Sequence, residues 1–96
     1  MTRELPIPPD AEATTHAVEI LRGWVIDGSL QCSLLPTIWK DDPGTWGLLL
    51  ADASGHIADA LHKEYGMDRE AVLQEIKRHF LVEMERPTVE REGDFS

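Results

Sequence analysis

The clearest hydrophobic pattern in the chain lies between Ile20 and Leu35, where two runs flank the dipeptide Asp27-Gly28. Asp-Gly favours a two-residue type I′ turn, because both central residues of that turn need a positive φ. The turn predicts a β-hairpin with six residues on one face, and none of them is polar: Leu21, Gly23, Val25, Leu30, Cys32 and Leu34. We expect this face to meet the core of the protein.

The opposite face of the hairpin is apolar on one strand and polar on the other. The first strand contributes Ile20, Arg22, Trp24 and Ile26, and the second contributes Leu35, Ser33, Gln31 and Ser29. A three-residue loop with a bulge would instead shift the pairing by one residue and bring Trp24 beside Leu30 and Cys32. We prefer the two-residue turn, because it places no polar residue on the shared face. The candidate interaction residues are then Ile20, Trp24 and Ile26, which need a cover.

Two helical patterns follow the hairpin. Asp42-Pro43 predicts the N-terminus of a helix over about residues 43–65, and Gly66 predicts its end. Its apolar positions recur every three or four residues, at Trp46, Leu49, Leu50, Ala53, Ile57, Ala60 and Leu61. Asp68 caps a second helix over about residues 69–85, which we expect to bury Val72, Leu73, Ile76, Phe80 and Met84. Such a short connection predicts an antiparallel αα-hairpin.

The element order ββαα predicts an α+β fold with two layers. In this fold the β-hairpin, over about residues 17–35, packs against the αα-hairpin, because an isolated two-stranded sheet is only marginally stable in water. Three prolines predict that residues 1–15 form an extended arm. We expect residues 16–86 to form a single domain and residues 87–96 to form a flexible acidic tail.

Composition narrows the classes of partner. The chain has 96 residues and a net charge of −9 at pH 7, which opposes binding to nucleic acid and to anionic membrane surfaces. Cys32 is the single cysteine, so no internal disulfide can form, and we interpret it as a small buried hydrophobe. Because the sequence contains neither a signal peptide nor an apolar run of bilayer length, we expect a cytoplasmic protein.

Several segments together resemble a known family. They are Glu4-Leu5-Pro6-Ile7-Pro8-Pro9, Glu19-Ile20-Leu21-Arg22 with Trp24 and Asp27-Gly28, residues 42–52 (DPGTWGLLLAD) and residues 56–60 (HIADA). The chain is similar in these segments to a family of short alphaproteobacterial proteins catalogued as domain of unknown function 5076. The resemblance implies a bacterial cytoplasmic protein, and it implies no activity, cofactor or functional residue.

One strip of side chains could carry chemistry. Asp52, His56 and Asp59 lie four and three residues apart on the first predicted helix, so they stack on one side of it. Two carboxylates and an imidazole could bind a divalent metal or orient a general base. The other interpretation is a solvated helix surface, which we favour because three ligands from one helix rarely complete a coordination geometry. We therefore expect no catalytic residue and no cofactor.

These patterns favour a non-enzymatic interaction or structural module that self-associates through the Trp24 face or a sheet edge. Three covers for Trp24 remain open: residues 5–9 of the arm, a second copy of the chain, or a different protein. The alternative function is a small metal-binding or hydrolytic protein that uses Asp52, His56 and Asp59.

Overall fold

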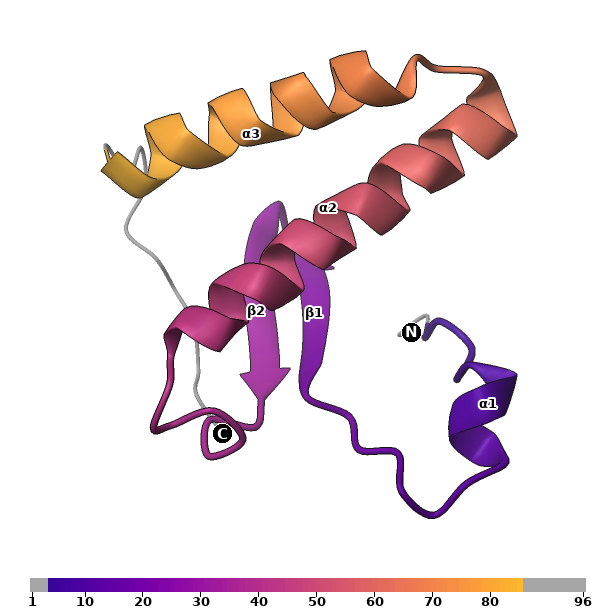
Figure 1. Cartoon of the computed structure of the whole chain (residues 1–96), viewed down its shortest axis with the longest axis vertical. Helices are drawn as coiled ribbons and strands as arrows, with labels where there is room; N and C mark the ends of the chain where they lie inside the picture. The colour runs from indigo at the N-terminus through magenta and orange to yellow at the C-terminus, as the bar shows by residue number, and fades with distance from the viewer. Residues whose placement is uncertain (1–3, 86–96) are drawn as a thin grey trace. The chain divides into compact units, whose positions relative to one another are not determined.

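The computed structural model describes residues 4–85. Their elements are a short helix α1 (Pro9–Glu12), strands β1 (Leu21–Ile26) and β2 (Ser29–Leu34), and helices α2 (Gly44–Tyr65) and α3 (Arg69–Glu85), as Figure 1 shows. The order ββαα and the α+β class are confirmed. α2 begins one residue later than predicted, and α3 has the predicted bounds. The predicted tail over residues 87–96 lies outside the described residues.

The described chain divides into two compact units, one of residues 4–38 and one of residues 39–85. The first contains the arm and the hairpin, and the second contains α2 and α3. Each is described by itself below. The two-layer packing of the helices on the hairpin and the single domain over residues 16–86 stay predictions.

The hairpin has the register that the two-residue turn requires. Asp27 has φ of 50° and Gly28 has φ of 82°, as a type I′ turn needs. β1 and β2 pair antiparallel, with Leu21 opposite Leu34, Gly23 opposite Cys32 and Val25 opposite Leu30. The shifted register with a three-residue loop is therefore excluded. On this predicted core face Val25 is 78% exposed and Leu30 is 61% exposed, so the rest of its own unit does not bury it.

The N-terminal arm is only partly extended. Residues 4–8 have no regular structure, but Pro9–Glu12 forms one helical turn. The prediction of an extended arm was wrong for these four residues. Proline at the first helical position has the φ of a helix already, and the Pro8 carbonyl accepts hydrogen bonds from the backbone N–H groups of Ala11 (2.9 Å) and Glu12 (3.2 Å).

The ends of the long helices follow their local signals with one exception. Gly66 has φ of 68° and donates its N–H to the His62 carbonyl at 2.9 Å. Asp68 caps α3 as predicted, because its Oδ2 accepts the Ala71 N–H at 2.9 Å. The predicted side-chain cap by Asp42 is wrong: Pro43 precedes the first helical residue, and no side-chain cap bond forms there.

α2 contacts α3 through its smallest residues. Ala58 is fully buried and Val72 is 8% exposed, whereas Ile57 is 49% exposed. A Cβ atom on Gly55 would lie 3.8 Å from the Arg69 guanidinium, so the first side chain of α3 reaches α2 beside this glycine. The predicted buried stripe is wrong within the described residues at Leu50, Ile57 and Ala60, which are exposed. Its other members, Trp46, Leu49, Ala53 and Leu61, are half-buried.

The αα-hairpin is open at its far end. α2 and α3 diverge from their connection (Figure 1), and the burial of α3 follows that divergence. Val72, Leu73 and Ile76 are buried or half-buried, as predicted. Phe80 is 42% exposed and Met84 is 60% exposed, so the prediction of their burial was wrong within the described residues. None of the helices in residues 4–85 is long and apolar enough to cross a membrane.

A substitution on each side of α2 distinguishes the observed contact from the predicted one. Ala58→Leu should lower the free energy of unfolding by about 1–3 kcal/mol, because the added methylenes have no space where the helices meet. Ile57→Ala is the matched control and should cost less than about 1 kcal/mol, since that side chain is half exposed. Urea unfolding followed by circular dichroism measures both. A larger effect from Ile57→Ala would contradict the observed packing.

Candidate functional site: a groove between the arm and β1

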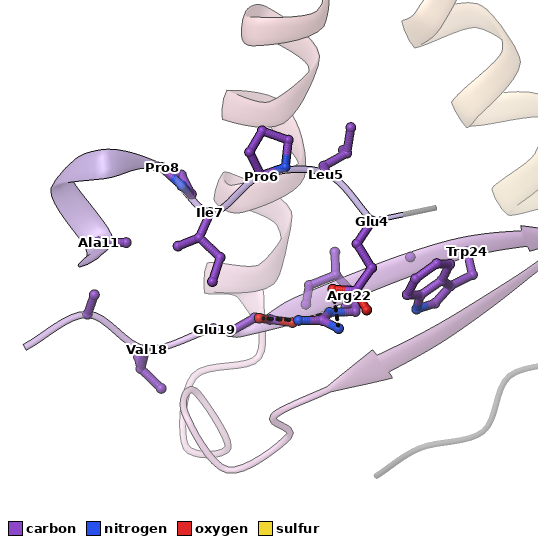
Figure 2. A pocket seen from close by; sticks show the side chains of 13 residues that line it. Glu4, Leu5, Pro6, Ile7, Pro8, Ala11, Val18, Glu19, Arg22 and Trp24 are labelled. Carbon is purple, nitrogen blue, oxygen red and sulfur yellow. Dashed lines mark hydrogen bonds and ion pairs between the residues drawn. The ribbon is translucent and has the colours of Figure 1, made fainter. Parts of the chain in front are cut away.

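A groove separates the N-terminal arm from the first strand. In Figure 2 the arm residues Glu4 to Pro8 run along the side of β1 that faces away from β2. The groove has a volume of about 570 Å³, and the arm forms one wall while residues between Ala17 and Trp24 form the other. This volume lies in the range of small-molecule sites, but the groove is only partly enclosed.

The arm lies near Trp24 without sealing it. Trp24 is half-buried at one end of the groove. Leu5 is 91% exposed and points away from the strand, while Ile7 points toward it and is still 55% exposed (Figure 2). The large side chains of the arm therefore bury little area against β1, and burial of apolar area is what would hold the arm in place. Residues 5–9 are at most a partial cover for Trp24.

Three charged residues that line the groove, Glu4, Glu19 and Arg22, lie close together. The Arg22 guanidinium donates to both carboxylate oxygens of Glu19, from Nε to Oε1 at 2.6 Å and from Nη2 to Oε2 at 2.9 Å. The same hydrogen bonds lower the pKa of Glu19 and raise the pKa of Arg22. Glu4 reaches Arg22 only at 3.8 Å, between Oε2 and Nη1. This solvent-exposed ion pair is a weak tie between the arm and β1.

Of the three predicted interaction residues, only Trp24 lines the groove. Ile20 and Ile26 share a strand face with Trp24, because alternate residues of a strand point to the same side. Ile20 is half-buried and Ile26 is 44% exposed. The groove itself was not predicted. Its signal in the sequence is the proline-bearing arm, but nothing in the sequence says where the arm lies.

The predicted strip on α2 is used in a different way. Arg69 of α3 donates from Nε to Oδ1 of Asp59 at 2.5 Å, which lowers the pKa of Asp59 and raises that of Arg69. Asp52 and His56 are exposed. Within residues 4–85 no group of three or more His, Cys, Asp or Glu side chains is placed to hold a metal ion. The strip therefore gives one carboxylate that links α2 to α3.

Comparisons with known proteins identify relatives but assign no role to any residue. Residues 4–88 match the family described as "Domain of unknown function (DUF5076)". No curated protein matches the chain. A solved structure from the photosynthetic bacterium Rhodopseudomonas palustrus CGA009, named provisionally as a pyruvate dehydrogenase, is 32% identical with a TM-score of 0.76. The match covers 100% of this chain and 97% of that one.

Removing the Arg69 guanidinium tests the link between α2 and α3. In Arg69→Gln the pKa of Asp59 should rise toward the ordinary carboxyl value, because the hydrogen bond that favours its charged form is lost. A lowered pKa in the folded state means that the pair supports folding above the unfolded pKa, and that this support disappears as pH falls through the folded pKa. NMR titration of the carboxyl carbons measures the change. Glu75, which Arg78 holds in the same way, is the internal control and should titrate unchanged.

Proposed function

This chain belongs to the family described as "Domain of unknown function (DUF5076)", and we propose that it is an interaction or structural module that self-associates, not an enzyme. The description of the family assigns no activity. The proposal therefore depends on surface chemistry, and the observation that carries it is the small amount of burial in the described residues.

Most large apolar side chains of residues 4–85 are not buried within the described structure. Among the described residues only Ala58 and Val72 are buried hydrophobes. Sixteen large hydrophobic residues in the range 4–85 are exposed: Leu5, Ile7, Val18, Leu21, Val25, Ile26, Leu30, Leu48, Leu50, Ile57, Tyr65, Met67, Phe80, Leu81, Val82 and Met84. A monomeric protein rarely leaves so much apolar surface in water, because each square ångström buried contributes about 25 cal/mol. Self-association would remove such surface from water. The exposed apolar side chains therefore support the proposed function.

The Trp24 face is the surface that we propose for the contact. It joins a half-buried Trp24 to Ile20 and Ile26, while the residues opposite them on β2 are polar. If the helices pack on the Leu21 face as predicted, they cannot also cover this one, because the two faces of a sheet point in opposite directions. Aromatic residues dominate the energetics of protein interfaces, so Trp24 is the expected anchor.

Charge sets the conditions for self-association. Two copies with a net charge of −9 each repel one another at long range, so we expect association to strengthen as salt screens the repulsion. The same charge argues against nucleic acid and anionic lipid as partners. We further propose a cytoplasmic location, which fits a chain with a single cysteine.

The alternative functions have less support. A metal-binding or hydrolytic protein needs Asp52, His56 and Asp59 to act together, and Arg69 already pairs with Asp59. The similar structure is named provisionally as a pyruvate dehydrogenase, but that description names no residue that this chain could share. Neither alternative explains the exposed apolar face.

Sedimentation equilibrium tests the proposed function. The wild-type chain should sediment above its monomer mass of 10.8 kDa, and Trp24→Glu should weaken association at least about tenfold, equivalent to about 1.4 kcal/mol. Gln31→Glu is the matched control: it adds the same charge at the position opposite Trp24 and keeps the indole. A wild-type chain that is monomeric at every concentration would refute the proposal.

A further inference from the structure

Within residues 4–85, one edge of the first strand has no backbone partner. The Leu35 N–H donates to the Ile20 carbonyl at 3.0 Å, which fixes which residues of β1 direct their backbone groups toward β2. Hydrogen-bonded and non-hydrogen-bonded pairs alternate along an antiparallel ladder. The backbone N–H and C=O groups of Arg22, Trp24 and Ile26 therefore point toward β2. The backbone groups of Leu21, Gly23 and Val25 then point outward, and within residues 4–85 no hydrogen bond from them is found outside the strand pairing.

The arm does not satisfy this edge. It runs beside β1 on the outward side, where the groove separates the two. Pro6 and Pro8 have no N–H to donate, and none of the hydrogen bonds found in residues 4–85 joins the arm backbone to β1. One weak ion pair, between Glu4 and Arg22, ties the arm to this side of β1, so a second extended chain that pairs with the edge displaces the arm. A strand edge without backbone partners is a template for such a chain.

We propose that this edge pairs with β1 of a second copy of the chain, in an antiparallel arrangement centred on Gly23. This inference rests on the proposed self-association and specifies its surface. The two hairpins then form one four-stranded sheet in the order β2-β1-β1-β2, with a two-fold axis at the centre. Three or more strands make a sheet independently stable, whereas a two-stranded sheet is marginal in water.

The residues that this register brings together are complementary. Leu21 lies opposite Val25 of the second copy, and Ile20 lies opposite Ile26, so apolar side chains meet on both faces. Arg22 lies opposite Trp24 in a pair without hydrogen bonds, where cross-strand side chains approach most closely. Arg22 uses Nε and Nη2 for Glu19, which leaves the plane of its guanidinium able to stack on the indole ring.

Other registers and the other edge fit less well. Centring the pair on Arg22 would place two guanidinium groups opposite each other, and like charges in that position destabilise a sheet. Pairing through β2 would join Ser29, Gln31 and Ser33 to their copies on the Trp24 face. Only pairing through β1 brings the two Ile20, Trp24 and Ile26 strips side by side, and this doubles the apolar surface that the copies share.

A proline substitution on each strand tests the edge directly. Val25→Pro removes an outward N–H without breaking a bond between β1 and β2, because proline is tolerated at strand edges. It should weaken association at least about tenfold. Leu30→Pro is the matched control: Leu30 lies opposite Val25 and carries the outward N–H of β2. It should leave association unchanged. Sedimentation equilibrium gives both constants, and circular dichroism reports whether each variant folds.

Hydrogen exchange in the unmodified chain gives a second readout that needs no variant. At concentrations where the chain is associated, the amides of Leu21, Gly23 and Val25 should exchange at least about tenfold more slowly than those of Leu30, Cys32 and Leu34. Dilution to the monomer should remove this difference. Equal exchange at both edges of the associated chain would overturn the proposal, even if Val25→Pro fails to fold.

The two proposals fail in different ways. A chain that associates but keeps its affinity in Val25→Pro uses another surface, so the β1 pairing is wrong while the interaction function stands. A chain that is monomeric at every concentration contradicts both. Association that is lost in Leu30→Pro and kept in Val25→Pro would assign the contact to β2 and overturn the inference.

Discussion

The type I′ turn at Asp27-Gly28 is the constraint on which the first unit depends. Positive φ at both residues sets a two-residue loop, and the loop length sets the register of every pair behind it. Register in turn decides which side chains share a face and which backbone groups point away from the partner strand. The position of Trp24 on one face and the outward direction of the Leu21, Gly23 and Val25 backbone groups both follow from two residues at the end of the hairpin.

The second unit is organised by close approach of its helices. α2 presents Gly55 and Ala58 to α3, and the fully buried side chain of Ala58 contributes little hydrophobic area by itself. The ion pair between Asp59 and Arg69 adds a directional link at the same level. Within the described residues Leu48, Leu50 and Ile57 of α2 remain exposed, whereas Trp46, Leu49 and Leu61 are half-buried.

Charged groups are used locally in both units. Arg22 is held by Glu19 and Arg78 by Glu75, each three residues away in sequence. Helical spacing accounts for the pair on α3 but not for the pair at the start of β1. The contact of Arg69 with Asp59 joins residues ten positions apart across a turn. Spacing on one helix suggested that Asp59 acts with His56. In the structure the chain turns at Gly66, and the Arg69 guanidinium of α3 pairs with Asp59 instead.

The amino-acid sequence determined what local stereochemistry controls: the turn, the strand register, the helix stop at Gly66 and the cap at Asp68, because each needs only a few neighbouring residues. It did not determine which side of α2 meets α3, since hydrophobic periodicity favours Ile57 whereas close packing favours Ala58. It also did not place the arm beside β1. The contact between α2 and α3 and the position of the arm depend on how segments distant in sequence fit together. There the packing of side chains outweighs the hydrophobicity of single residues.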